Sequence, residues 1–533
     1  MRLLRFSALA LGCAALLHAA PAITSVYNAA SYTPPGLPNS GIAQGSIFIL
    51  FGSGLGPSTL QQVESYPLPT TQGLGGTSIQ VTVGSATETC PMIYTSAGQV
   101  AAILPSATPV GTGTLALTFQ GVTSSTSIQV LAANFGTLAL NEAGSGPGVV
   151  TDTSFNPITY INPAHPGQTL ILWGTGLGAI TGSETEPPMQ VDLHTGVQVF
   201  VAGQSATVLY GGRGSSPGLD QIDFTIPSGV STGCKTSVAV LVKGVTGNIT
   251  TLAIAPDGQA TCGDTAGALT AANLEKAISS GSLNIGIVQL SRFGSGDNDL
   301  LAGYGSFPLN SLIRSYGGTF GPSIGSCVAY EVSGSSLVLR DPILPTYLDG
   351  GSDLAITGPA GTKTIAEISK GEFLATLAAA PSTFVEPGSY SVSNGNGGAG
   401  VGSFTWDLTL PSNVVPTNIP SSISRGKNLT LTWTGGSAYP VVTIFGYNGL
   451  IAGGSNSYVE FICNAVGSAE QFTIPSVILN LLPPDGFGAF GVPGVALEIA
   501  GYAEAHFTAT GSPGLDVGTF GAFVANGKIA KIQ

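Results

Sequence analysis

The sequence predicts an all-β protein of tandem β-sandwiches, with one short connector helix and a further β-rich C-terminal half. One block is written twice: Gly45–Gly56 reads GSIFILFGSGLG and Gly167–Gly178, 122 residues further on, reads GQTLILWGTGLG. The segments Gln99–Pro105 and Gln221–Pro227 match at the same offset. Among 533 residues, 77 are Gly and 35 are Pro, while 43% are hydrophobic. Turns are therefore frequent, and enough apolar residues remain to build cores.

Each copy of the block belongs to a unit of several short strands, region 23–133 for the first copy and region 134–262 for the second. The strand candidates are Ser46–Phe51, Thr77–Val83, Val100–Leu104, Thr114–Phe119 and Ser127–Leu131 in the first unit, then Thr169–Trp173, Val197–Ala202, Ala206–Tyr210, Gln221–Ile226, Ser237–Val242 and Thr250–Ile254 in the second. Short strands at this spacing, separated by Gly, Pro, Ser and Asn, are typical of β-sandwiches.

Residues 263–282 interrupt the strand pattern. Thr265 can cap a helix over Ala268–Ser279, with Leu269, Leu274 and Ile278 on its apolar side. We expect this segment to be a connector helix.

Strand patterns return in residues 283–533. The candidates are Leu283–Leu290, Cys327–Val332, Leu354–Ile356, Gly402–Leu410, Asn428–Thr434, Val441–Phe445, Phe472–Ile474 and Val495–Ile499. The segment Pro411–Pro420 is rich in Pro, Ser and Asn, which favours a boundary between a β-rich domain at 283–412 and a β-sandwich-like domain at 413–533. The alternative is that the two halves share one core.

The first 22 residues have the pattern of a secretory signal peptide. Two arginines precede the apolar run Phe6–Leu17, and Ala20-Pro21-Ala22 forms an A-x-A cleavage site, with Ala19 as a rival end point. A lipoprotein signal at Cys13 is the alternative. We therefore expect a secreted or cell-surface protein.

Charge and hydropathy limit the partners. The chain has 15 Lys and Arg against 28 Asp and Glu, a net charge of −13, and no basic run. Nucleic acids and anionic membrane surfaces are therefore unexpected partners. No later window offers about 18 uninterrupted apolar residues, so no transmembrane segment is predicted after the signal peptide.

Five cysteines follow the signal peptide, and export permits disulfides. Cys234 and Cys262 bracket one predicted hairpin, so we pair them. Cys327 with Cys463 is the second predicted pair and would join two distant segments. Cys90 would then be free and buried beside an apolar strand, the alternative being a catalytic thiol.

Motif tests assign no cofactor-binding, metal-binding or catalytic residue. The turn Gly52–Gly56 has the spacing G-x-G-x-G, and no helix or βαβ pattern follows it, so its glycines are expected to shape a turn. His165, His194 and His506 are the only histidines after the signal peptide, and none lies in a zinc motif. A Ser-His-Asp triad stays open, because its members can be distant in sequence.

Acidic residues cluster in three loops. Asp297 and Asp299 lie in a Gly/Ser loop, and Asp349–Asp353 spans another. Their oxygens could hold Ca²⁺, but neither loop follows the EF-hand pattern, so solvated turn residues are the favoured interpretation. Glu184 and Glu186 are the closest carboxylate pair for glycoside hydrolysis, and we expect both to be solvated.

The three tryptophans test for a sugar-binding platform. Trp406 and Trp433 share the parity of apolar neighbours on their strands, and Trp173 lies in an apolar run. All three are expected in cores, which disfavours such a platform. Tyr447 and Tyr458 remain as exposed aromatic candidates.

The repeated strand-and-turn block resembles IPT/TIG-like immunoglobulin-fold domains. Region 23–262 is similar to the uncharacterised tandem module of secreted acidobacterial proteins, the Solibacter-type domain. The matching stretches are Tyr27–Ser31, Gly45–Gly56, Leu68–Thr71, Tyr94–Pro105 and Asn162–Ala164. The resemblance implies tandem immunoglobulin-like β-sandwiches and export, and it transfers no catalytic residue.

These observations predict an exported, non-enzymatic protein that is structural or adhesive, or that binds an extracellular protein, glycan or surface. The loops at 56–76 and 178–196 differ between the repeats and are the first candidates for binding. The alternative is a secreted enzyme or carbohydrate-binding accessory protein with its active part in 283–533. A concave polar cleft near His506 or Asp297 would favour that alternative.

Overall fold

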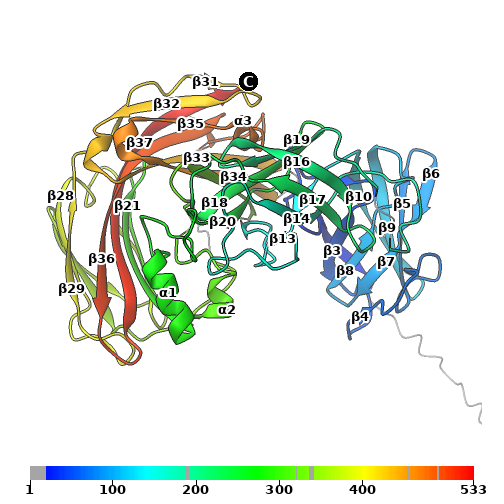
Figure 1. The fold of residues 1–533 in the computed structure, drawn as a ribbon. Helices are drawn as coiled ribbons and strands as arrows, with labels where there is room; N and C mark the ends of the chain where they lie inside the picture. Colours follow the sequence, from blue (N-terminus) through cyan, green and yellow to red (C-terminus); the bar gives the residue numbers. More distant parts are fainter. Residues whose placement is uncertain are drawn as a thin grey trace, which may run out of the picture.

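The computed structural model describes residues 20–187, 191–294, 296–319, 321–334, 341–452, 455–488 and 491–533. Most of the predicted signal peptide lies outside these residues. Strands dominate, and the predicted all-β class is confirmed. In Figure 1 a first sandwich unit (blue) is followed by a second (teal to green), which lies beside a larger body coloured green to red.

Two five-stranded sheets form the first unit, in the orders β1-β3-β8-β7-β4 and β2-β10-β9-β5-β6. Their strands are β1 (Ala22–Asn28), β2 (Ile42–Ala43), β3 (Ile47–Ser53), β4 (Gln61–Gln62), β5 (Thr77–Val83), β6 (Ala86–Thr89), β7 (Met92–Thr95), β8 (Gln99–Ile103), β9 (Gly111–Phe119) and β10 (Val122–Leu131). Alternation along β5 buries Ile79 and Val81 against Phe48 and Leu50 of β3.

The second unit is a ten-stranded sheet in the order β11-β14-β17-β16-β15-β18-β20-β12, with β13 on β14 and β19 on β18. The strands are β11 (Gly136–Thr137), β12 (Gly146–Pro147), β13 (Val150–Asp152), β14 (Thr169–Thr175), β15 (Val197–Val201), β16 (Gln204–Arg213), β17 (Asp220–Thr225), β18 (Gly233–Val242), β19 (Val245–Thr246) and β20 (Thr250–Ile254). A register shift between Val208 and Tyr210 marks a bulge in β16, the strand between β17 and β15.

The repeated block forms equivalent strands, β3 and β14, each packed closely against a neighbour. A Cβ on Gly52 would lie 2.0 Å from the Ala22 carbonyl oxygen, and one on Gly174 would lie 2.2 Å from that of Gly136. Gly176 has a φ of +114°, which a residue with a side chain rarely adopts. These glycines are therefore required by close strand approach and by turn geometry.

The connector helix α1 (Ala271–Ser280) begins later than predicted. Thr270, and not Thr265, caps it by accepting a hydrogen bond from the Asn273 amide. Ile278 is 46% exposed, so its predicted place on the apolar side is wrong: Leu274 and Ala277 supply that side. The other helices are short: α2 (Leu309–Leu312), α3 (Ser476–Leu479), η1 (Gly436–Ala438) and η2 (Gly467–Ala469). Within the described residues, no helix has both the length and the apolar character needed to cross a membrane.

One ten-stranded sheet organises the C-terminal body, in the order β23-β34-β33-β36-β37-β21-β22-β24, with β27 on β22 and β31 on β37. Its strands are β21 (Ser282–Arg292), β22 (Asn298–Pro308), β23 (Ser326–Ser333), β24 (Thr346–Tyr347), β27 (Glu372–Ala378), β31 (Ser422–Ile423), β33 (Val441–Ala452), β34 (Ser455–Val466), β36 (Val495–Ala509) and β37 (Leu515–Ile532). The strands β21 and β37 run parallel, with Gly286 in register with Gly518, and join the two ends of the body.

Two smaller sheets pack against one face of this large sheet. They are β26-β25-β28-β29 and β30-β32-β35, made of β25 (Asp353–Gly358), β26 (Gly361–Ala366), β28 (Gly388–Ser393), β29 (Thr405–Leu410), β30 (Val415–Pro416), β32 (Leu429–Thr434) and β35 (Gln471–Ile474). One core of buried residues runs through all three sheets. Strands from both sides of Pro411–Pro420 thus share a sheet and a core, which is the alternative left open by the sequence. The other domain boundaries remain a proposal.

The tryptophans differ in burial. Trp433 is 2% exposed and lies in the core, as predicted. Trp173 is half-buried, and its indole N–H donates to Thr151. Trp406 is 40% exposed, so its predicted core position is wrong. It shares parity with the buried Leu408 and Leu410, but it lies on β29, an edge strand of its sheet.

Both cysteine pairs expected from the sequence are disulfide-bonded in the structure. Cys234 joins Cys262 beneath α1, and Cys327 of β23 joins Cys463, its register partner on β34. Cys90 is a buried free thiol, and burial raises its pKa far above the ordinary value. A thiol held protonated in this way is a poor nucleophile, which argues against the catalytic alternative.

A substitution tests the requirement for glycine in β14. We expect Gly174→Ala to destabilise the second unit by about 2–3 kcal/mol, because its Cβ would clash with the Gly136 carbonyl of β11. The matched control is Gly426→Ala, where the added Cβ meets nothing within 4 Å. Thermal unfolding of both variants gives the comparison, and equal melting temperatures would contradict the close-approach account.

Candidate functional site

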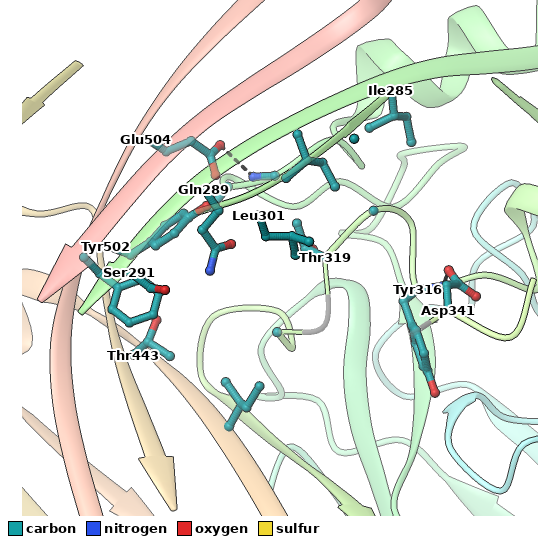
Figure 2. Close-up of a pocket in the computed structure, with 18 of the residues that line it drawn as sticks. Ile285, Gln289, Ser291, Leu301, Tyr316, Thr319, Asp341, Thr443, Tyr502 and Glu504 are labelled. Atoms are coloured by element: carbon teal, nitrogen blue, oxygen red, sulfur yellow. Dashed lines mark hydrogen bonds between the residues drawn. The ribbon is translucent and has the colours of Figure 1, made fainter. Parts of the chain in front are cut away.

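The C-terminal body contains a cavity of about 500 Å³ against the face of its large sheet that the smaller sheets leave uncovered. Side chains alternate along each strand, so one parity faces the core and the other faces the cavity. On β21, Val288 and Leu290 lie in the core, whereas Ile287, Gln289 and Ser291 line the cavity (Figure 2). The strands β22, β33, β34 and β36 contribute further lining residues. We call this lined surface the cavity face.

Loops and one strand of the second unit line the rest of the cavity. The second unit contributes Lys235 of β18, and the loops contribute residues 264–267, Tyr316, Gly318, Thr319, 321–324 and Asp341. Figure 2 shows Tyr316, Thr319 and Asp341 of this wall. The Gly267 amide donates to Glu504 Oε1 at 2.8 Å, which connects the first of these loops to β36. The cavity is thus built from two units and depends on their contact.

A buried lysine and a buried aspartate form one polar wall. Lys235 Nζ donates to both the carbonyl and the hydroxyl oxygen of Thr319. Asp264 Oδ1 accepts hydrogen bonds from the Cys234 amide at 3.1 Å and the Ser323 hydroxyl at 2.5 Å. Burial lowers the pKa of Lys235 and raises the pKa of Asp264, because each charged form has lost its hydration.

Glu504 and its neighbours form the polar end of β36. Glu504 Oε1 also pairs with His506 Nε2, and this hydrogen bond raises the pKa of His506. Glu504 Oε2 is buried and no hydrogen bond of normal geometry reaches it from the described residues, although the Tyr502 hydroxyl interacts with this carboxylate. Burial raises the pKa of Tyr502 well above its ordinary value, and the adjacent Glu504 adds to this shift.

Two further carboxyl groups line the cavity. Glu460 lies on β34 in register with Tyr330 on one side and Tyr447 on the other. Burial raises its pKa to about 7, and none of the described residues forms a hydrogen bond or ion pair with its carboxylate. Burial also raises the pKa of Asp341 to about 6, although the Tyr316 amide donates to it at 2.7 Å.

An aromatic stripe crosses the cavity face between these groups. Phe293 follows the end of β21, Phe445 lies on β33 and Phe523 lies on β37. Their ring centroids are 5.2–5.4 Å apart. Tyr502 extends the stripe, 6.4 Å from Phe523. A mostly apolar cavity with a few converging polar groups is the usual form of a small-molecule site.

The predicted site residues have different fates. His506 lies beside the cavity, whereas His194 pairs with Asp192 on the second unit and the Nδ1 of His165 has no partner among the described residues. No histidine ring in the described part of the chain bonds to a serine, so the open triad gains no support. Tyr447 and Tyr458 stack on each other at 5.4 Å.

The acidic residues of the three loops lie in different environments. Asp299 lines the cavity and accepts from the Thr376 hydroxyl, while Asp349 accepts two backbone amides as a turn residue. No described group of three or more His, Cys, Asp or Glu could hold a metal ion, so the Ca²⁺ alternative gains no support. Glu186 is exposed, but Glu184 is largely buried against the Ser106 amide, so its predicted solvation is wrong.

Sequence reasoning missed the main polar residues of the cavity. Glu460 and Glu504 each stand inside an apolar strand of a chain in which only 8% of residues are charged. A carboxylate inside an otherwise apolar strand was the sequence signal that could have identified these residues. Lys235 and Asp264 gave no such signal, because they meet the strands of the cavity face only in the folded chain.

The raised pKa of Glu460 predicts a pH dependence of stability. An unfolded chain ionises this carboxyl near pH 4.5, whereas the folded protein keeps its proton to about pH 7. Stability should therefore fall between these two pH values, by about 3 kcal/mol from this group. We expect Glu460→Gln to exceed wild type in urea midpoint above pH 7 and to equal it below pH 4.5.

The control for this experiment is Glu275→Gln on the exposed side of α1. It should follow the wild-type pH dependence throughout. If Glu460→Gln followed it as well, Glu460 would not be the titrating group.

No family model matches this chain, and no curated protein matches it. Among solved structures, the chain is similar to a tetra-tandem repeat from the extending region of a large adhesion protein, with 14% identity, 96% of this chain and 100% of that chain covered, and a TM-score of 0.14. It is also similar to the S-layer protein rSbsC (11% identity, 95% and 54% covered, TM-score 0.19) and to a fragment of titin (9%, 74% and 93%, 0.13). Since these TM-scores carry no argument about the overall structure, the fold class rests on the strand topology of this chain.

Proposed function

We propose that the chain is an exported, non-enzymatic structural or adhesive protein that presents its β-sandwich units as one rigid body to an extracellular protein, glycan or surface. We also propose that the first two units are IPT/TIG-like. The observation that carries the proposal is the set of buried polar contacts between the units. Such contacts fix orientation, because any rotation would leave charges and amides unpaired.

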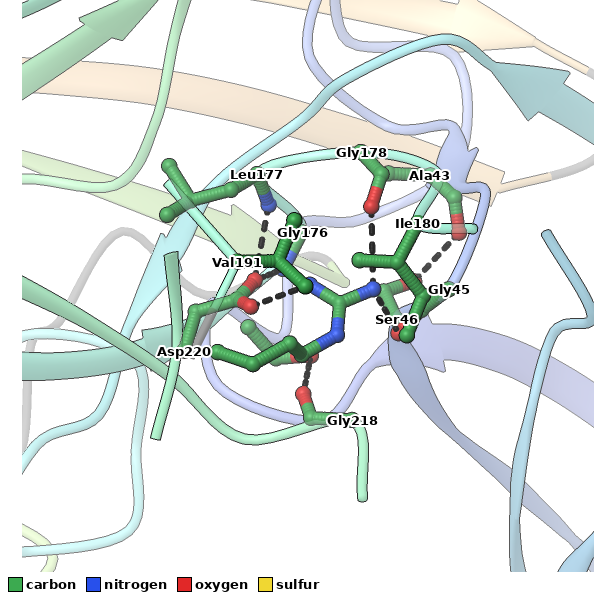
Figure 3. A network of polar contacts seen from close by, with 12 residues as sticks. Ala43, Gly45, Ser46, Gly176, Leu177, Gly178, Ile180, Val191, Gly218 and Asp220 are labelled. Carbon is green, nitrogen blue, oxygen red and sulfur yellow. Dashed lines mark hydrogen bonds and ion pairs between the residues drawn. The ribbon is translucent and has the colours of Figure 1, made fainter. Parts of the chain in front are cut away.

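The buried ion pair of Arg213 and Asp220 lies within the second unit, at its junction with the first unit (Figure 3). The side chains of both residues are fully buried. Arg213 Nη2 donates to the carbonyl oxygens of Gly45 in the first unit at 3.1 Å and Gly178 in the second at 2.9 Å. Asp220 Oδ2 accepts the Gly176 amide at 2.7 Å. The ion pair therefore joins both copies of the repeated block.

Asparagines and a threonine extend this interface. Asn28 Nδ2 of β1 donates to the carbonyl oxygens of Asn134 and Thr175, at 3.2 and 3.3 Å. The Ile47 amide donates to Thr175 Oγ1 at 2.9 Å. Asn134 in turn donates to the Gly41 carbonyl in the first unit. All these groups point across the junction, so the junction has one preferred geometry.

The first unit also contacts the C-terminal body directly. Glu331 of β23 accepts hydrogen bonds from Thr33 at 2.6 Å and Asn39 at 2.7 Å. Ser457 of β34 donates to the Pro35 carbonyl at 3.1 Å. The loop between β1 and β2 thus connects the first unit to β23 and β34 of the C-terminal body. The two sandwich units and the C-terminal body therefore stabilise one another's positions.

The candidate binding surface is the loop at 56–76. Leu60 and Tyr66 are 56% and 45% exposed there. The loop at 178–196 lies against it, because the Leu68 amide donates to the Thr185 carbonyl at 2.6 Å. Exposed large apolar side chains on a supported loop are typical of recognition sites.

A second candidate function, a carbohydrate-binding accessory protein or enzyme with its active part in 283–533, is favoured by the cavity described above. Of these two options, accessory protein and enzyme, we favour ligand binding without catalysis. The rigid-body proposal does not depend on this candidate.

The loop is tested by capture experiments with the full mature chain. We expect Leu60→Ala with Tyr66→Ala to weaken capture on extracellular protein and glycan arrays about tenfold, because interface energy concentrates in large side chains. Leu209→Ala, 56% exposed on the second unit, is the matched control and should bind as wild type does. Retention of full binding by the double variant would reject the loop.

The interface is tested by Arg213→Met. The substitution leaves Asp220 buried and uncompensated, so we expect a loss of about 3–5 kcal/mol and a looser first unit. Thermal unfolding measures the first effect and small-angle scattering the second. Lys363→Met, at an exposed position of β26, should change neither. A wild-type scattering profile and melting curve for Arg213→Met would contradict the rigid-body account.

A further inference from the structure

Two carboxylates that line the cavity each keep one buried oxygen that no hydrogen bond of normal geometry reaches from the described residues, Oε2 of Glu504 and Oδ2 of Asp264. The Glu504 side chain is only 6% exposed. Its other oxygen accepts from Gly267 and His506, and the other oxygen of Asp264 accepts from Cys234 and Ser323. A buried acceptor without a donor is unfavourable, so a bound molecule that supplies donors would be stabilised here.

Acidic groups outnumber basic groups around these oxygens. Acidic residues that line the cavity are Asp264, Asp299, Asp341, Glu372, Glu460 and Glu504. The nearby basic groups are Lys235, which lines the cavity, and His506, already paired with Glu504. Lys235 spends two of its three N–H groups on Thr319. The acidic excess favours a cationic ligand and disfavours an anion.

The aromatic stripe lies next to Glu504. Tyr502 is two residues before Glu504 on the same face of β36, and its ring lies 6.4 Å from Phe523. Phe293 and Phe445 continue the stripe on Phe523. Phenylalanine rings provide apolar contact and attract ammonium groups, but they offer no hydrogen bonds to sugar hydroxyls.

We propose that this cavity binds an amphipathic amine. Its ammonium group donates to Glu504 and Asp264, and its apolar body lies along the stripe of Tyr502, Phe523 and Phe445. The proposal rests on one part of the second candidate function, that the cavity is a ligand site, and it replaces the carbohydrate with an amine. It goes further by naming the ligand class and the two carboxylates that select it.

Three probes of equal length test the proposal: octylammonium, octanol and octanoate. Each is titrated calorimetrically into the full mature chain. We expect octylammonium to bind about tenfold more tightly than octanol, because only the ammonium makes charge-assisted hydrogen bonds. Octanoate should not bind.

Substitutions locate the site. Glu504→Gln keeps the side-chain shape and removes the charge. It should therefore weaken the binding of octylammonium about tenfold and leave the binding of octanol unchanged. Unchanged octanol binding also shows that the variant is folded. Phe523→Leu should weaken both probes. Asp257→Asn, in an exposed loop of the second unit, is the control and should change neither.

Four outcomes would overturn the inference. Equal affinity for octanol and octylammonium would leave the cavity as a ligand site without selection for a cation. Tightest binding of octanoate would mean that Lys235 selects the ligand. If Glu504→Gln left the affinity for octylammonium unchanged, the ammonium group would have to bind elsewhere. Failure of all three probes would remove both the inference and the second candidate function, while leaving the rigid-body proposal intact.

Discussion

The parallel pairing of β21 with β37 is the constraint on which the C-terminal body depends. The first strand after the connector helix pairs with the last strand of the chain, from Ile285 with Val517 to Arg292 with Val524. The β21–β22 hairpin is thereby added to the sheet formed by β33, β34, β36 and β37. One face of this sheet covers the main core, and the other is left to form the cavity face. Neither the core nor the cavity would be complete with only one half of this sequence.

The same arrangement explains how a chain with few charged residues gathers them at the cavity and at the junctions between units. Period-two alternation sends every second side chain of a long strand away from the core. Where another unit covers that second face, polar side chains become buried and their pKa values shift, as for Glu460 and Lys235. The junctions between units use the same means, with Arg213 and Asp220 buried where the two repeated blocks meet. Structure and candidate function therefore both rely on polar groups enclosed between units.

The sequence was most informative where the physical signal is local. Alternating apolar residues predicted strands such as β5 and β21, and the repeated glycines predicted strand-end turns. Features that depend on distant contacts escaped it: Trp406 has core parity but lies on an edge strand, and Glu184 is covered by the first unit. The cavity escaped it for the same reason, because loops and strands from residues 235 to 523 meet only in the folded chain.

Hydrogen exchange of the native full-length chain tests the central claim, that the C-terminal body is one cooperative sheet joined by β21 and β37. Amides in a shared cooperative unit exchange with a common opening free energy. The account predicts that backbone amides of β21, β33, β36 and β37 share the slowest exchange and lose protection together as denaturant is added. Earlier loss of protection in β21 and β22, while β33, β36 and β37 stay protected, would contradict it.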